Sequence, residues 1–240
     1  MMFLYFNGCS YTKGKGIDGN DQDRINKRFS TLVSSRLGAD HHNDAKAGSS
    51  NDGIVYRTFE WMQNNTCDQA VILMTHAARM DLSINGVQPN RKTLMPGYSY
   101  QKNCDTKFYD CTPELANKMR LFYDNFYTDQ VGAINFYKNR YLLEQFFEKR
   151  GIPLLLLQFT PFPCQETNPF KTLCKGDLPL VQKTFWNNFE LSPSIKTILG
   201  RRGNKEYYYS EDRKEVIGHF NSKGHEKLAD WIVDKLTSTI

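Results

Sequence analysis

The chain has 240 residues, of which 40% are hydrophobic and 24% are charged, and its formal net charge is +5. This length and composition favour one globular domain that buries a sizeable core without disulfides or metals. So mild a charge argues against a nucleic-acid-binding protein, which usually has a denser basic face. No apolar stretch approaches the ~20 residues that a membrane-spanning helix needs, and the first residues do not resemble a signal peptide.

The six cysteines have no spacing typical of a zinc site or of a disulfide framework. Reduced thiols and a cytoplasmic location are therefore expected, with no metal and no other cofactor. Cys104 and Cys111 lie in the same irregular segment, so a bridge between these two stays open.

The first predicted strand covers residues 2–6 and stops at Asn7-Gly8, where small polar residues follow at once. A buried strand that ends in such a turn delivers a side chain to the edge of a sheet. We predict that Ser10 is a nucleophile on this turn, and that Cys9 beside it is a small buried residue. The alternative for Ser10 is a structural cap of the turn or of the helix that follows.

Helices and strands alternate along the next part of the chain. Apolar residues at helical spacing predict a helix that ends at Gly38, and a weak polar strand follows at residues 39–45. A second turn of small residues, 46–53, leads into another helix. Residues 70–74 are apolar throughout, which is typical of a central parallel strand.

Two irregular segments interrupt this pattern, at about residues 82–112 and 162–212. Loops of this length are usually functional or mobile, so the first is a candidate lid. Residues 113–150 are predicted to be helical with a break near Thr128-Asp129, and a strand follows at 154–159. A last amphipathic helix begins near His225, which is interpreted as a structural residue. We expect one domain over residues 1–240 with insertions at the two irregular segments.

The alternation of helices with apolar strands predicts a three-layer α/β/α fold, a parallel sheet with helices on both faces. In such sheets, ligands bind beyond the carboxyl ends of the strands. The turns after the first three strands should therefore gather at one edge, where the loop around His219 can join them.

A serine nucleophile needs a base to take its proton and donors to hold the oxyanion. We predict His219 as the base, and the backbone N–H groups of Ser10 and Gly48 as the donors. The side chain of Asn51 is either a further donor or the N-cap of its helix. A weaker alternative is phosphate binding by the helix start at residues 48–53.

Three blocks of sequence together resemble the SGNH/GDSL hydrolase superfamily. They are Gly8-Cys9-Ser10-Tyr11-Thr12, Gly48-Ser49-Ser50-Asn51 and His219-Phe220-Asn221-Ser222-Lys223-Gly224-His225. In this resemblance Ser10 matches the nucleophile, Gly48 an oxyanion donor and His219 the base. It covers the chain apart from the two irregular segments, and it implies a flavodoxin-like fold and hydrolysis of esters, acetyl groups or related acyl bonds. The second block is most similar to SGNH-like proteins of tailed phages, which implies the host cytoplasm or the virion as location.

The chain departs from the family pattern in three places. Cys9 stands where the family has Asp, residues 75–78 lack the usual Asn, and Val216 takes the place of the acid that orients the histidine. Glu215, Asp212 or a backbone carbonyl is then the candidate for orienting His219. A Ser–His pair still catalyses without the acid, although roughly 10⁴-fold more slowly.

The sequence thus predicts a serine esterase that acts on a small-molecule or carbohydrate ester, with no nucleic-acid or membrane partner and with its oligomeric state open. The alternative is a catalytically degenerate binding or phage structural protein with the same fold. His76 and Arg79 follow a central strand, so they are expected either to bind an anionic group of the substrate or to pair with Asp81.

Overall fold

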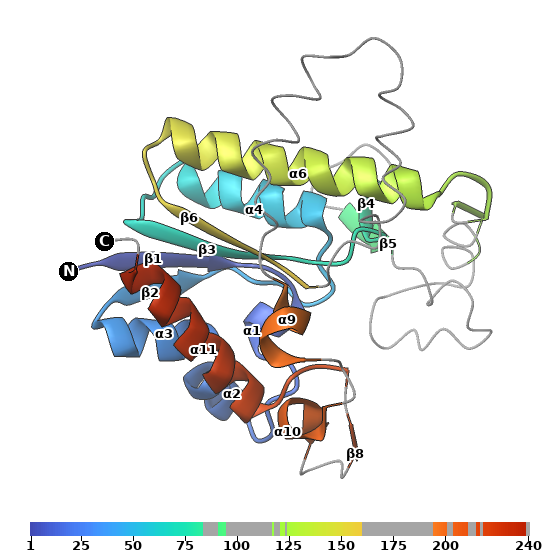
Figure 1. The fold of residues 1–240 in the computed structure, drawn as a ribbon. Coiled ribbons are helices and arrows are strands. Elements are labelled where there is room, and N and C mark those ends of the chain that lie inside the picture. Colours follow the sequence, from blue (N-terminus) through green and yellow to red (C-terminus); the bar gives the residue numbers. More distant parts are fainter. Residues whose placement is uncertain are drawn as a thin grey trace.

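The structure is a computed structural model that describes residues 1–83, 91–94, 117, 121–122, 124–159, 194–200, 204–210, 215–216 and 218–238. At its centre lies a parallel sheet of four strands in the order β2-β1-β3-β6 (Figure 1). These strands are β1 (Phe3–Asn7), β2 (Asp40–Asn43), β3 (Gln69–Met74) and β6 (Leu154–Gln158).

Helices cover both faces of this sheet, which confirms the predicted three-layer α/β/α fold (Figure 1). One face carries α2 (Asp21–Lys27), α3 (Phe29–Leu37), α9 (Ile195–Leu199) and α11 (Ser222–Thr237). The other face carries α4 (Asn51–Met62) and α6 (Asp129–Lys149).

Alternate residues of each strand face different cores, because successive side chains of a strand point to opposite faces of the sheet. In β1, Leu4 and Phe6 pack with residues of α3 and α11, whereas Tyr5 packs with residues of α4 and α6. In β3, Leu73 and Ile72 divide in the same way. The strands are therefore buried on both faces, as their apolar sequences predict.

Helix ends match the sequence where a capping residue marks them. α3 ends at Gly38, whose φ is 60°, and α6 begins after Thr128, whose side chain accepts a hydrogen bond from Val131 N. The predicted break near Thr128-Asp129 is thus confirmed. The prediction missed α2, which starts with a capping box between Asn20 and Asp23.

Most of the two predicted insertions, with Cys104, Cys111 and the candidate lid, lies outside the described residues. The parts that are described contain regular elements, so the prediction of irregular structure is wrong for them. They are the antiparallel pair β4 (Met80–Ser83) and β5 (Arg91–Leu94), α9, α10 (Lys205–Tyr208), and the antiparallel pair β7 (Tyr209–Ser210) and β8 (Glu215–Val216). The division into one domain with two insertions stays a prediction.

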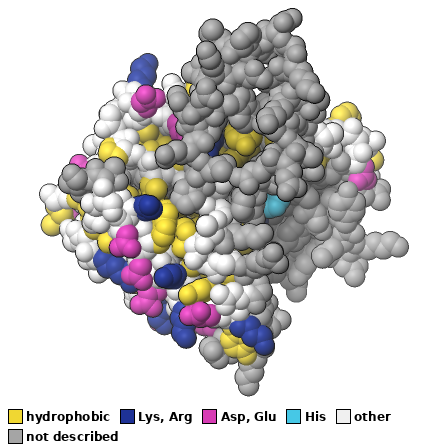
Figure 2. All heavy atoms as spheres, in the orientation of Figure 1, with side chains coloured by type: hydrophobic (Ala, Val, Ile, Leu, Met, Phe, Trp, Pro, Cys, Tyr) yellow, Lys and Arg dark blue, Asp and Glu magenta, His cyan; other side chains and the backbone are white. Residues whose placement is uncertain are grey.

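The surface formed by α3 and α11 mixes charges of both signs (Figure 2). Arg36 of α3 pairs there with Asp230 at 3.0 Å and with Glu226 at 3.8 Å, both from α11. Within the described ranges, no helix is both long and apolar enough to cross a membrane.

His225 lies completely buried in the first turn of α11. Its Nδ1 accepts a hydrogen bond of 3.2 Å from Phe29 N, and its ring stands edge-on to Phe220. Burial lowers the pKa of His225 to about 3, and the nearby charges of His219 and Arg28 act in the same direction. The imidazole is therefore neutral in the folded protein, as expected for a structural histidine.

We predict that His225 makes the folded state less stable in acid. The unfolded chain binds a proton at this residue below about pH 6.5, whereas the folded chain does so only near pH 3. The free energy of unfolding should therefore fall as the pH drops from about 6.5, with a limiting slope of about 1.4 kcal/mol per pH unit from this group. Urea denaturation at several pH values measures the slope.

His225→Gln, which keeps a hydrogen-bond acceptor, should flatten this slope. The matched control is His76→Gln, because His76 is exposed and should leave the slope as in the wild type. Equal slopes for wild type and His225→Gln would contradict the prediction.

Candidate active site

Ser10 lies just beyond the carboxyl end of β1, at the start of the short helix α1 (Ser10–Lys13). Its neighbour Cys9 is fully buried, as predicted, and is the residue before the helix. The chain leaves β1 toward α3 on one face, and it leaves β3 toward α6 on the other. The ends of β1 and β3 therefore form a topological switch point, where ligands bind in sheets of this kind.

The structure brings His219 to Ser10 across 209 positions of sequence, with 2.8 Å between His219 Nε2 and Ser10 Oγ. Ser10 is 5% exposed. The loop that carries His219 is fixed directly after it, because Phe220 is fully buried and Asn221 Nδ2 donates to the carbonyl of Tyr209 at 3.0 Å.

Gly224 explains how this loop packs against the start of α11. A Cβ at this position would lie 2.6 Å from Phe220 Cβ and 3.0 Å from the carbonyl oxygen of Tyr207. A residue with a side chain would push the helix away from the loop, so the glycine of the last block serves close packing.

The second turn of small residues lies against the turn that carries Ser10. Lys46 N donates to the carbonyl of Gly8 at 3.3 Å, and Gly48 adopts a φ of 78°, which favours glycine. Within the described part of the chain, the N–H groups of Ser10 and Gly48 donate to no other protein group. Both predicted oxyanion donors thus belong to two turns in direct contact.

Asn51 joins the second turn to the end of β3. Its Oδ1 accepts from Thr75 N at 2.8 Å, and its Nδ2 donates to the carbonyl of Thr75 at 3.3 Å. The N-cap of α4 is Ser50, whose side chain accepts from Gly53 N, so the alternative of Asn51 as N-cap is wrong. A role of Asn51 as oxyanion donor stays a prediction.

Arg57 of α4 connects the two turns through its guanidinium. Nη2 donates to Asn7 Oδ1 at 3.1 Å and to the Gly8 carbonyl at 3.3 Å. Nη1 donates to Ser49 Oγ at 2.9 Å, and Nε donates to the carbonyl of Asp44 at 3.1 Å. Burial lowers the pKa of Arg57, and the carboxylate of Asp44 opposes this shift.

Asn7 completes this connection from the first strand. Its amide nitrogen donates to Thr58 Oγ1 at 2.9 Å and to the carbonyl of Ile54 at 3.1 Å, and its Oδ1 accepts from Gly8 N at 2.7 Å. The side chain of Asn7 is fully buried. It therefore fixes the turn before Ser10 against α4.

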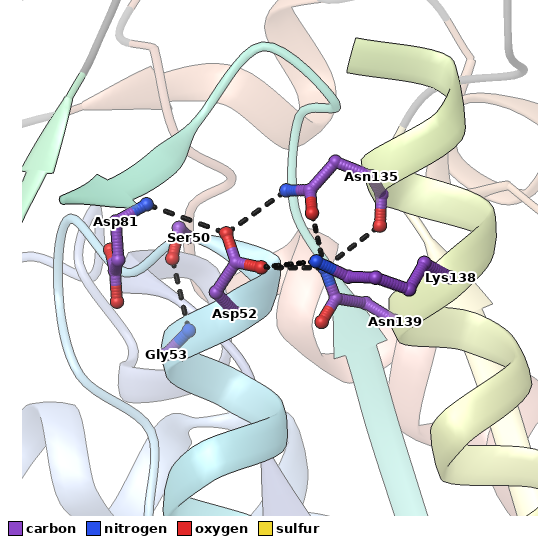
Figure 3. A network of polar contacts seen from close by, with 7 residues as sticks. All are labelled: Ser50, Asp52, Gly53, Asp81, Asn135, Lys138 and Asn139. Atoms are coloured by element: carbon purple, nitrogen blue, oxygen red, sulfur yellow. Dashed lines mark hydrogen bonds and ion pairs between the residues drawn. The ribbon is translucent and has the colours of Figure 1, made fainter. Parts of the chain in front are cut away.

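A polar network holds the start of α4 against α6 (Figure 3). The carboxylate of Asp52 accepts from Asn135 Nδ2 at 2.9 Å and from Asn139 Nδ2 at 3.0 Å, and it pairs with Lys138 at 3.4 Å. Burial raises the pKa of Asp52, but the hydrogen bonds from Asn139 and Asn135 outweigh burial and leave the pKa below its usual value. Asp52 thus stays ionised beside the helix that begins at the second turn.

The remaining predicted site residues are less directly connected to Ser10. His76 is exposed, whereas Arg79 donates to Thr75 Oγ1 at 3.0 Å and to the Ser49 carbonyl at 3.5 Å. Glu215 belongs to β8, and Asp212 lies outside the described residues. The group that orients His219 therefore stays a prediction.

An open pocket of about 570 Å³ lies beside the loop that carries His219. Apart from Tyr209, its lining is polar or charged. The lining residues are Asp18, Lys205, Glu206, Tyr209, Asn221, Ser222 and Lys223. In the described part of the chain, no three His, Cys, Asp or Glu side chains are grouped so that they could hold a metal ion.

Comparison with solved structures shows the fold. The psychrotrophic esterase EstA from Pseudoalteromonas sp. is similar over 99% of this chain and 98% of its own, with a TM-score of 0.52 and 9% sequence identity. The chain has the fold of this esterase. The fold that the resemblance to SGNH/GDSL hydrolases implies is therefore confirmed.

Further solved structures with this esterase-like fold align over almost the whole chain. A member of the lipolytic protein G-D-S-L family from Veillonella parvula covers 99% of both chains, with a TM-score of 0.46 and 11% identity. The lipase/acylhydrolase from Enterococcus faecalis aligns over 100% of this chain and 97% of its own, with a TM-score of 0.48 and 16% identity. No protein-family model matches the sequence, and no curated protein is significantly similar to it.

Sequence reasoning missed Asn7 and Arg57, which fix the two turns within the esterase-like fold. The pair Asn7-Gly8 was interpreted only as the end of a strand. Arg57 falls on one face of a helix with no motif around it, so its contacts with Gly8 and Ser49 had no local signal.

We predict that Arg57→Met destabilises the protein by about 1–3 kcal/mol, because it leaves buried acceptors of the two turns without a donor. Chemical denaturation measures the free energy of unfolding. Arg150→Met is the matched control, since Arg150 donates to the carbonyl of Met62 at the other end of α4 and is itself exposed. A loss for Arg57→Met no larger than that of the control would contradict the prediction.

Proposed function

We propose that the protein is a serine hydrolase of carboxylic esters, with Ser10 as nucleophile and His219 as general base. The observation that carries this proposal is the 2.8 Å separation of Ser10 Oγ and His219 Nε2. This separation lies within the range over which a base accepts the proton of a nucleophile. The esterase fold and the position of Ser10 at the switch point of the sheet support the same assignment.

The proposed reaction follows from these two groups. His219 Nε2 takes the proton of Ser10 Oγ while the oxygen attacks the ester carbonyl, and the negative charge moves to the carbonyl oxygen. The N–H groups of Ser10 and Gly48 are the proposed donors to this oxygen. When the intermediate collapses, the leaving alcohol receives the proton from His219. Water, deprotonated by the same imidazole, then releases the acyl group from Ser10.

An acylated carbohydrate is the proposed substrate class. The pocket beside the His219 loop offers hydroxyl, amide, ammonium and carboxylate groups, which suit a hydroxylated ligand better than a long apolar chain. Arg79 and His76, at the end of β3, are proposed to contact the substrate from the other side of the switch point.

The test is covalent labelling by a fluorophosphonate, together with hydrolysis of a chromogenic acetyl ester. Wild type should be labelled, and Ser10→Ala should lose both labelling and hydrolysis, because the attacking oxygen is absent. His219→Ala should slow both by about 10²- to 10⁴-fold, the usual contribution of a general base. A phosphonate is an apt probe, since EstA is described as inhibited by monoethylphosphonate.

Ser30→Ala serves as the control, because Ser30 is another fully buried serine and lies on α3. It should be labelled and should hydrolyse the ester at the wild-type rate. Folded wild type that is neither labelled nor active would overturn the proposal. That outcome would favour the alternative of a non-catalytic binding protein with the same fold.

A further inference from the structure

The side chain of Tyr11 contacts the histidine loop at two points. Tyr11 follows Ser10 in α1 and is 5% exposed. Its ring centroid lies 4.7 Å from that of His219, with 38° between the ring planes. Its hydroxyl donates a hydrogen bond of 2.5 Å to the carbonyl of Gly218, the residue before His219. One side chain therefore touches both the imidazole and the backbone that carries it.

Tyr11 is itself held by rings from two other segments. Its ring centroid lies 4.3 Å from that of Phe159, directly after β6, and 4.9 Å from that of Phe220, directly before α11. Tyr11 and Phe220 belong to the core between the sheet and α11, and Phe159 packs against that core. Because these contacts come from both sides of the loop, the Tyr11 ring cannot move without disturbing packed neighbours.

Position along the chain adds a second constraint. Ser10 and Tyr11 share the first turn of α1, so the placement of one backbone fixes that of the other. The same short helix thus presents the nucleophile on one residue and the support for its base on the next. The distance between Ser10 Oγ and His219 Nε2 depends on the contact between Tyr11 and the loop.

We propose that Tyr11 is the positioning residue for His219, holding Nε2 within reach of Ser10 Oγ. This inference rests on the proposed esterase function. The hydroxyl fixes the peptide between Gly218 and His219, and the ring limits the rotation of the imidazole. Tyr11 takes no proton in the reaction and acts only through His219.

A tyrosine that only filled the core would require its ring and not its hydroxyl. Tyr208 provides the comparison within the same core, because it is 2% exposed and its ring lies edge-on to Phe220 at 6.3 Å. The loss of either hydroxyl should affect stability to a similar degree. The two tyrosines should differ in their effect on the reaction.

The experiment compares Tyr11→Phe, Tyr11→Leu and the control Tyr208→Phe. Fluorophosphonate labelling is measured over a range of probe concentrations, which separates the maximal rate from the half-saturating concentration. Tyr11→Phe should lower the maximal rate about tenfold, because one hydrogen bond to the loop is lost. Tyr11→Leu should lower it about 10²-fold, as expected for a displaced catalytic group. The half-saturating concentration should not change in any variant, and Tyr208→Phe should react as wild type does.

Proton NMR of the His219 imidazole gives a readout that is independent of reactivity. The Tyr11 ring is close enough to shift these resonances through its ring current. Tyr11→Leu should remove the shift, whereas Tyr11→Phe, which keeps the ring, should preserve most of it. If Tyr11→Leu does not fold, Tyr11→Phe alone carries the kinetic test.

Two outcomes would overturn the inference. One is a maximal labelling rate for Tyr11→Phe equal to that of Tyr208→Phe. The other is a set of imidazole resonances that are the same in wild type and Tyr11→Leu. Failure of the proposed function would look different, because wild type itself would not be labelled while the NMR comparison would still report the contact between Tyr11 and His219.

Discussion

The guanidinium of Arg57 holds together the two turns on which the candidate site is built. It donates to the Gly8 carbonyl on one turn and to Ser49 Oγ on the other. Its planar fork of donors suits several fixed acceptors at once, which an ammonium group would not. All four printed acceptors are neutral oxygens. Arg57 therefore acts through the geometry of its hydrogen bonds and not through a direct ion pair.

A series of fixed contacts extends outward from this guanidinium. Asn7 connects it to Thr58 and Ile54 inside α4, and Asp52 connects the first turn of the same helix to α6. The turn before Ser10 is thus fixed to a helix that is fixed to a second helix. A nucleophile gains from such preorganisation, since small displacements of reacting groups cost large factors in rate.

The fold could be predicted from the sequence because its determinants are local. The apolar runs that form β1, β3 and β6 are short and sharply bounded, and Gly38 and Thr128 mark helix ends by their conformation or capping. The order β2-β1-β3-β6 follows from the rules for parallel sheets with crossover helices. Ser10 and His219 were predicted because their sequence blocks match a family pattern, and the structure brings the two side chains together.

The support of the site could not be predicted in the same way. Arg57, Asn7 and Tyr11 are common residue types, and their partners lie tens or hundreds of positions away. The contact of Tyr11 with Gly218, for example, spans 207 positions. Asn51 was predicted to face the oxyanion or to cap its helix, but the backbone of Thr75 occupies its amide. Such choices depend on which segments become neighbours, and spacing along the chain does not reveal that.

The long separation between Ser10 and His219 has a consequence for how the molecule comes to work. A ribosome makes Ser10 and its turn 209 residues before it makes the histidine. The imidazole reaches the serine only when α11 has packed against α3, which is among the most distant contacts of the chain. The serine of an unfinished chain is thus an ordinary alcohol, and its reactivity marks the moment at which the last helix docks.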